Sequence, residues 1–242
     1  MQLTNSNLRI NIQHVEELMS AISPNQITAG RFRFNLPPQQ ALDLLTATYR
    51  LEVEKRHRKF ILDDNTTDNL IRFTSYITQP VPEFGVMLCG TCGNGKTTLL
   101  YAFRRAINVL NGLGHFTFLT SVDPNFHPGL TTYRAREIVQ LSSNTDRFEK
   151  IKNSPMLAID DLGTEPLEKR DYGDIITPVV ELIEHRYNKQ LFTFITTNLI
   201  ANSKDENTVT IRSKYGDRVA DRFNEMLHVI VFKDTSYRTK PS

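Results

Sequence analysis

Eight residues in the first half of the chain carry the groups best suited to hold phosphate. They read G-x-x-x-x-G-K-T and begin at Gly90. Glycines at this spacing let the backbone curl so that its N–H groups point at the phosphates of a nucleotide. Lys96 would reach the β- and γ-phosphate oxygens, and the Thr97 hydroxyl would bind Mg²⁺. The residues predicted to contact the nucleotide are Gly90, Thr91, Cys92, Gly93, Asn94, Gly95, Lys96, Thr97 and Thr98.

The flanking residues place this motif in the context that its chemistry needs. The apolar run 84–89 before it is typical of a buried parallel strand. Apolar residues at 99, 100, 103, 106, 107 and 110 behind it recur at helical spacing. Strand, glycine-rich turn and helix in this order predict a P-loop nucleotide-binding protein, and they disfavour a chance glycine-rich turn.

Two further strand ends carry polar side chains that fit the same site. Four apolar residues at 156–159 end in Asp160 and Asp161, about 60 residues after the P-loop. Because ligands bind at the carboxyl ends of parallel strands, Asp160 is predicted to hold Mg²⁺ and Asp161 to polarise the attacking water. The strand 191–196 leads to Asn198, which can orient that water; the alternative is an asparagine that only ends the strand.

Apolar periodicity and turn residues along the chain predict an α/β fold. We expect a parallel five-stranded sheet flanked by helices, with strands at 84–89, 115–120, 155–159, 191–196 and 228–232. Helices are expected over 99–110, 132–141, 146–152 and 174–188, and a helical hairpin over 211–223. Pro178 lies in the first turns of the helix 174–188, so its alternative start is near Thr177.

The region before the P-loop strand is predicted to hold a separate small domain. Pro37 and Pro38 start a helix whose apolar stripe is Leu42, Leu45, Tyr49 and Val53. Its basic second half, 50–59, is either a solvated face or a contact surface for an acidic partner or DNA. We place the boundary near Leu62, with a helical N-terminal domain at 1–62 and the nucleotide-binding domain at 63–242.

Composition limits the possible classes of protein. The formal net charge of +2 makes no claim on nucleic acid by itself, so any basic surface must be local. No apolar run approaches the roughly 20 residues that span a bilayer, and the first residues lack a signal-peptide pattern. The cytoplasm is the expected location.

The two cysteines, Cys89 and Cys92, lie at the P-loop and are better explained as a strand end and a loop position than as a redox pair.

The order of these motifs resembles the AAA+ superfamily, and more narrowly the DnaC/DnaI-type helicase loaders and the related IstB-type transposition ATPases. The resemblance covers about residues 62–238. Its most specific part is the run YGDRVADRF at 215–223, followed by a strand and then by SYR at 236–238. A chain that ends soon after the fifth strand also predicts, like these families, no full C-terminal helical lid.

This resemblance implies roles for further residues. Asn198 would be sensor 1, Arg222 or else Arg218 the arginine finger acting on a neighbouring subunit, and Arg238 a sensor 2-like residue. Many AAA+ proteins have Glu where this chain has Asp161, one methylene shorter, which implies slower hydrolysis or compensating geometry. Residues 1–88 contain no cysteine, so the cysteine-ligated zinc of some loaders is not expected here.

The function implied is Mg²⁺-dependent ATP binding and hydrolysis by a loader of a replicative helicase onto single-stranded DNA. The helicase would dock on residues 1–62, and the protein would form a homo-oligomer when bound to ATP and DNA. The alternatives are an IstB-like transposition helper, a P-loop kinase for a small acceptor, and a nucleotide-binding adaptor that hydrolyses too slowly to count as an enzyme.

Overall fold

Five parallel strands form the central sheet of the computed structural model, which describes residues 31–113, 119–120, 129–171, 173–200, 208–233 and 236–237. The strand order is β4-β5-β8-β2-β9. The bounds are β4 Thr131–Arg134, β5 Met156–Leu162, β8 Phe192–Thr197, β2 Gly85–Gly90 and β9 His228–Phe232. The predicted α/β class, with a parallel five-stranded sheet and flanking helices, is confirmed.

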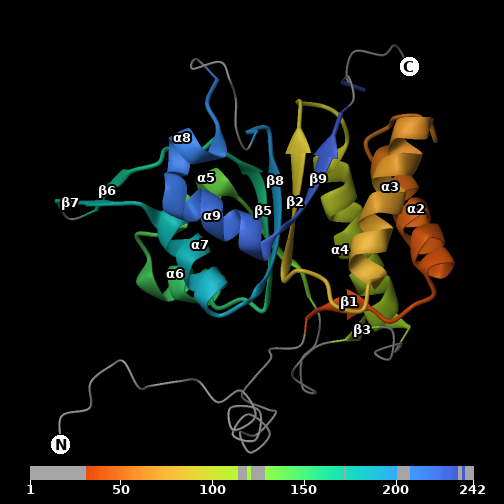
Figure 1. Cartoon of the computed structure of the whole chain (residues 1–242), viewed down its shortest axis with the longest axis horizontal. Coiled ribbons are helices and arrows are strands. Elements are labelled where there is room, and N and C mark those ends of the chain that lie inside the picture. The colour runs from red at the N-terminus through yellow and green to blue at the C-terminus, as the bar shows by residue number, and fades with distance from the viewer. Residues whose placement is uncertain are drawn as a thin grey trace, which may run out of the picture. The chain divides into compact units, whose positions relative to one another are not determined.

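Helices cover both faces of this sheet (Figure 1). One face is covered by α4 (Lys96–Gly112), with α2 (Pro38–Glu54) and α3 (Asp64–Thr78) packed on it. The other face is covered by α5 (Ala135–Leu141), α6 (Thr145–Lys152), α7 (Pro178–Asn188), α8 (Ile211–Tyr215) and α9 (Asp217–Met226). Alternate strand residues serve the two cores: Val86 and Leu88 pack on the α4 side and Met87 on the α7 side.

The helix α2 belongs to the same compact unit as the sheet. This unit begins at Arg31. Leu45 is fully buried and Tyr49 nearly so, both in the core that contains α4. Glu52 of α2 accepts a hydrogen bond of 2.7 Å from Nε of Arg105 in α4. The predicted boundary near Leu62 therefore differs from the structure, because the apolar stripe of α2 is covered by α4 and α3 rather than left for a partner.

One expected strand does not lie in the central sheet. Of the predicted strand 115–120, the described part is β3 (Leu119–Thr120), which pairs antiparallel with β1 (Arg33–Phe34). The fifth place in the sheet is taken by β4, which pairs with β5. We expected a helix from residue 132, but β-branched and aromatic residues at 131–133 favour a strand, and the helix α5 begins at Ala135.

The helix expected over 174–188 starts next to Thr177, as the position of Pro178 indicated. The residues before it form a hairpin of β6 (Lys169–Asp171) and β7 (Asp174–Ile176). The helix α7 begins at Pro178, because proline is tolerated in the first turn, where its missing N–H would have no partner within the helix. Among the described residues, no helix is both long enough and apolar enough to cross a bilayer.

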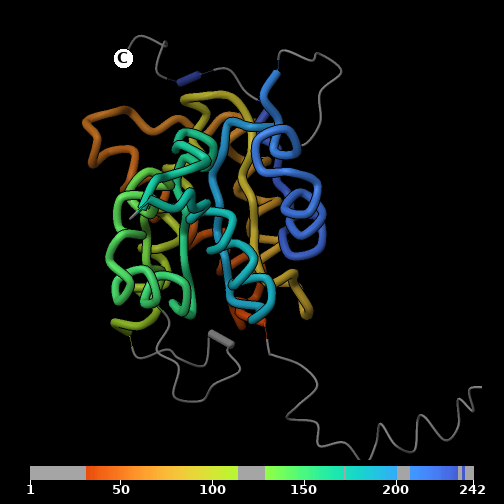
Figure 2. The backbone as a smooth tube through the Cα atoms, turned by 90° about the vertical axis from the view of Figure 1, so that its left-hand side faces the viewer, coloured from red at the N-terminus to blue at the C-terminus, as the bar shows by residue number. Residues whose placement is uncertain are grey.

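The carboxyl ends of the central strands meet the segment that follows α2. In both views, residues 55–63, drawn in orange, lie at the same end of the sheet as the P-loop after β2 (Figures 1 and 2). Residues 1–30 of the predicted N-terminal domain and residues 115–118 of the predicted strand lie outside the described residues.

Candidate active site

The P-loop joins β2 to α4, as predicted, and its backbone needs glycine. Gly95 has φ +100°, a conformation that residues with a Cβ rarely adopt. A Cβ at Gly95 would also lie 2.4 Å from the hydroxyl oxygen of Tyr49. Tyr49, on the buried face of α2, therefore packs against this turn.

Lys96 is held inside the P-loop by backbone and side-chain acceptors. Its Nζ donates to Gly90 O at 2.8 Å, to Thr91 O at 2.7 Å and to Oδ1 of Asn94 at 3.0 Å. Asn94 is buried and its Nδ2 donates to Phe232 O at 3.2 Å, which fixes its orientation. Burial lowers the pKa of Lys96. The ammonium group thus lies at the centre of the loop. Phosphate oxygens would replace the carbonyl and amide oxygens that it contacts here.

Asp160 lies beside the first turn of α4. Its Oδ1 accepts hydrogen bonds from the hydroxyls of Thr97, at 3.0 Å, and Thr196, at 2.6 Å. Burial raises the pKa of Asp160, and the hydrogen bond from Thr196 opposes that rise. A carboxylate and a threonine hydroxyl side by side are the oxygen donors that Mg²⁺ prefers, so these two residues fit the predicted metal.

Asp161 stands at an irregularity in the pairing of β5 with β8, between Ile159 and Leu162. Its φ is +57°, which is uncommon for a residue other than glycine. Its backbone N–H donates to Oγ1 of Thr196 at 2.9 Å. The bend turns Asp161 away from the sheet interior, so that successive carboxylates can serve the same site.

A cleft of about 920 Å³ brings together most of the predicted site residues. The predicted residues that line it are Cys92, Gly93, Asn94, Gly95, Lys96, Thr97, Thr98, Asp160, Asp161 and Asn198. Asn198 follows the end of β8 and is exposed. Arg238 lies outside the described residues.

The cleft also has walls that the sequence analysis did not assign. The segment after α2 contributes Arg56, His57, Arg58, Lys59, Phe60 and Ile61. Nη1 of Arg56 donates to Oγ1 of Thr98 at 2.9 Å. Basic residues of this segment therefore line the cleft, which neither of the two interpretations of 50–59 anticipated. Arg134, at the end of β4 opposite Asp160, lines the cleft as well.

Tyr237, the last of the described residues, also lines the cleft. Its backbone N–H donates to Gly93 O at 3.0 Å, and its hydroxyl donates to Oδ1 of Asp63 at 2.9 Å. Asp63 also caps the first turn of α3, since its Oδ1 accepts from the N–H of Thr66. The sequence SYR at 236–238 was part of the family resemblance, but the fold was needed to show that Tyr237 contacts the P-loop.

The two candidate arginine fingers lie on α9 and are not among the described residues that line the cleft. Both contact Glu184 of α7. Arg222 forms an ion pair with Glu184, lies 5.3 Å from the ring centroid of Tyr187 and has a side chain only 13% exposed. Nε of Arg218 lies 3.3 Å from Glu184, and its side chain is 77% exposed. Arg218 is thus the more accessible of the pair.

Comparison with known proteins shows which solved structures share this fold. No family model matches the sequence, and no curated protein matches it. A crystal structure of the DnaC helicase loader is similar, with 24% identity and a TM-score of 0.51, over 72% of this chain and 94% of that one. The DnaI structure is 18% identical with a TM-score of 0.51, over 84% and 94%.

A third structure agrees with these two. A putative primosome component from Streptococcus pyogenes serotype M3 is 17% identical with a TM-score of 0.50, over 83% of this chain and 100% of that one. At these identities the similarity shows a shared fold. DnaC and DnaI are of the type that the sequence motifs resemble. The chain therefore shares the fold of the DnaC helicase loader and of DnaI.

Proposed function

We propose that the protein binds and hydrolyses ATP with Mg²⁺. The observation that carries this proposal is the hydrogen bond between Thr97 and Asp160, which joins the P-loop to the β5 carboxylate next to Lys96. Lys96 would neutralise charge on the β- and γ-phosphates, and Asp161 and Asn198 would orient the attacking water. Thr97 and Asp160 would hold Mg²⁺, which shields phosphate charge when bound.

The remaining walls of the cleft suit the nucleoside. Tyr49, Phe60 and Tyr237 supply aromatic surface for a base, and Arg56 and Arg58 supply positive charge beside the first turn of α4. An apolar and aromatic wall with a few polar groups is the usual composition of a small-molecule site.

The experiment that tests the nucleotide chemistry is a comparison of purified wild-type protein with Lys96→Ala and Asp161→Asn. Lys96→Ala should lower hydrolysis by on the order of 10²-fold or more, because it removes the main positive charge at the γ-phosphate. Asp161→Asn should keep Mg·ATP binding and slow turnover. Unchanged hydrolysis in Lys96→Ala would refute the proposal.

The biological role that fits best is loading a replicative helicase onto single-stranded DNA. It is supported by the fold shared with the DnaC helicase loader and with DnaI. Since α2 is part of the ATPase core, we assign helicase docking within the predicted segment 1–62 to residues 1–30. Assembly into a homo-oligomer would bring Arg218 or Arg222 to a neighbour's ATP, and Arg238 would act on the nucleotide in cis. We expect this to occur in the cytoplasm.

Affinity capture with the full chain in its native cell, with ATP present, tests this role. The helicase should be retained by the wild type and lost when residues 1–30 are removed, while ATP binding persists. Capture of a transposase in its place would assign the chain to the IstB-like role. Retention of the helicase by the shortened chain would show that the docking assignment is wrong.

A further inference from the structure

The last two residues of β5 and the three that follow are held by side-chain hydrogen bonds at every residue. We call residues 161–165 the Walker B loop. Each of its five backbone carbonyls accepts a hydrogen bond from a side chain. The donors are Thr164 Oγ1 to Asp161 O (2.8 Å), Thr197 Oγ1 to Leu162 O (2.7 Å), Lys214 Nζ to Gly163 O (2.7 Å), Arg136 Nε to Thr164 O (2.7 Å) and Lys214 Nζ to Glu165 O (2.7 Å).

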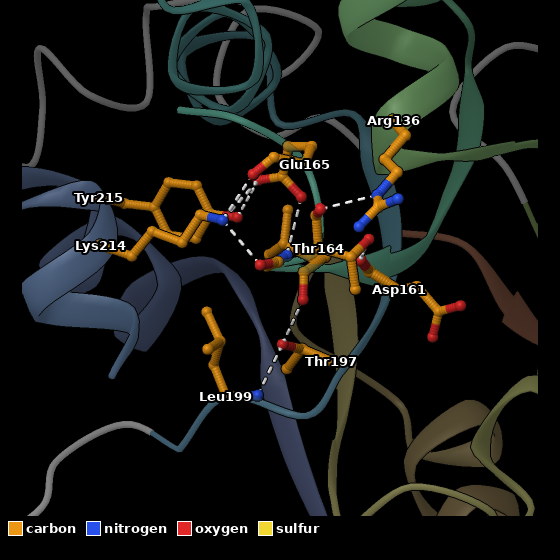
Figure 3. A network of polar contacts seen from close by, with 10 residues as sticks. Arg136, Asp161, Thr164, Glu165, Thr197, Leu199, Lys214 and Tyr215 are labelled. Atoms are coloured by element: carbon orange, nitrogen blue, oxygen red, sulfur yellow. Dashed lines mark hydrogen bonds and ion pairs between the residues drawn. The ribbon is translucent and has the colours of Figure 1, made fainter. Parts of the chain in front are cut away.

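Thr164 belongs to the loop itself, and the other donors come from three elements around it. Lys214 approaches from α8 on one side and Arg136 from α5 on the other (Figure 3). Thr197 belongs to the end of β8, next to Asn198, and its Oγ1 also accepts from the N–H of Leu199 at 3.0 Å. The Walker B loop is therefore the point where α5, α8 and the end of β8 meet.

The backbone of this loop needs such support. Asp161 has φ +57° and Gly163 has φ +104°. Left-handed conformations of this kind persist where the surroundings determine them. A Cβ at Gly163 would lie 2.8 Å from the side chain of Leu199, so the loop also packs tightly against the chain after β8.

Glu165 and Tyr215 anchor the α8 side of the loop. The Glu165 side chain is fully buried, and its Oε2 accepts from the Gly163 N–H at 2.9 Å. Its Oε1 accepts from the hydroxyl of Tyr215 and lies 3.8 Å from Nζ of Lys214. Burial, and then the charge of Glu165, raise the pKa of Tyr215, so the hydroxyl stays a donor. A buried carboxylate is tolerated because its partners are all present.

We infer that Lys214 of α8 and Glu165 of the Walker B loop are positioning residues for ATP hydrolysis, which hold the Asp161 carboxylate in its working geometry. The inference rests on the proposed function. Lys214 binds the carbonyls at both ends of the Gly163–Glu165 segment, so its removal leaves that segment without its cross-link. The left-handed turn at Asp161 then relaxes, and a displacement of about 1 Å at a catalytic group can lower a rate by about 10²-fold.

The connection extends to the arginine helix. After Tyr215, Gly216 is the only residue between α8 and α9, which carries Arg218 and Arg222. A change in the position of α9 on assembly would therefore act on the Walker B loop through Lys214.

Lys214→Met tests the inference, since methionine keeps most of the apolar stem and removes the donor. We expect kcat to fall about 10-fold to 100-fold, while the Kd for an ATP analogue stays within about twofold. Lys214→Arg, which can still donate to both carbonyls, should restore part of kcat. Lys152→Met is the matched control: Lys152 is similarly buried and pairs with Glu149 and Glu181, away from the cleft. It should lower the melting temperature and leave kcat unchanged.

Each other outcome overturns the inference. An unchanged kcat in Lys214→Met, a parallel loss of ATP affinity, or an equal loss of kcat in Lys152→Met would show that Lys214 is only structural. If Lys214→Met does not fold, Tyr215→Phe carries the test with the same criteria, because it removes one hydroxyl and keeps the ring. A wild-type protein without hydrolysis would refute the proposed function and this inference with it; an active wild type matched by Lys214→Met would refute the inference alone.

Discussion

Asp160 combines two demands that oppose each other. Mg²⁺ binding requires a charged carboxylate, but the side chain is buried beside Thr97 and Thr196, and burial raises its pKa. An acid whose pKa is raised in the folded state destabilises the fold at pH values above that pKa. The destabilisation disappears as the pH falls through the folded pKa, because the group then takes up a proton.

Asp160→Asn should therefore raise the melting temperature of the nucleotide-free protein at neutral pH. The gain should shrink as the pH falls through the pKa of Asp160, because the wild-type carboxyl is then neutral as well. The same variant should lose Mg²⁺-dependent nucleotide binding. Thermal unfolding between about pH 4 and 8 checks the first part, with the exposed Asp43→Asn as control. A lower melting temperature across that whole range would contradict the argument.

At this scale the sequence predicted the arrangement that depends on local order. Gly90 to Thr98 form the P-loop because strand, glycine turn and helix are contiguous. Arg56 and Tyr237 were missed because they reach the cleft only after the chain returns from distant positions. Their contacts, with Thr98 and Gly93, join residues more than 40 positions apart. No spacing within a single motif carries that information.

The helix α2 shows how an apolar stripe can be misinterpreted. The stripe lies in the segment 1–62 that we expected to dock a helicase, but it is covered by α4 of the same chain. The strand assignments failed for a related reason. Residues 115–120 and 131–134 both have strand-like composition, and which of them joins the central sheet is decided by pairing with β5, a tertiary contact.

Leu45→Ala should lower the free energy of unfolding by about 2–5 kcal/mol, because it leaves a cavity between α2 and α4. Leu51 lies on the same helix and is 50% exposed, so Leu51→Ala should cost less than about 0.5 kcal/mol. Urea unfolding of both variants measures the difference. If Leu45→Ala changed the free energy of unfolding less than Leu51→Ala, the packing of the α2 stripe within the core would be contradicted.

For the whole molecule, the exposure of the α9 arginines bears on assembly. The pair was expected from the resemblance, with Arg222 first. The ion pair of Arg222 with Glu184 gives it a structural role within its own subunit, whereas Arg218 is exposed enough to reach a neighbour. A side chain that acts in trans must be free of such burial before assembly.

Arg218→Ala should keep ATP binding and the wild-type melting temperature but lose hydrolysis in the assembled state, by up to about 10³-fold. Mixing it with Lys96→Ala should restore some activity, since one subunit supplies an intact site and the other an intact arginine. Arg222→Ala is the comparison and should mainly lower stability. Rescue by mixing that occurs with Arg222→Ala and fails with Arg218→Ala would reverse the assignment.

The wall formed by the segment after α2 has an optical consequence. Phe60 lines the cleft, its ring centroid lies 6.3 Å from that of Tyr49, and the chain contains no tryptophan. Phe60→Trp would therefore introduce a single indole fluorophore next to the expected position of the base. Its emission should change when ATP enters and should not respond in Lys96→Ala at the same nucleotide concentration. An ATP titration followed by tryptophan emission would then report occupancy of the cleft directly, without a radioactive label or a modified nucleotide.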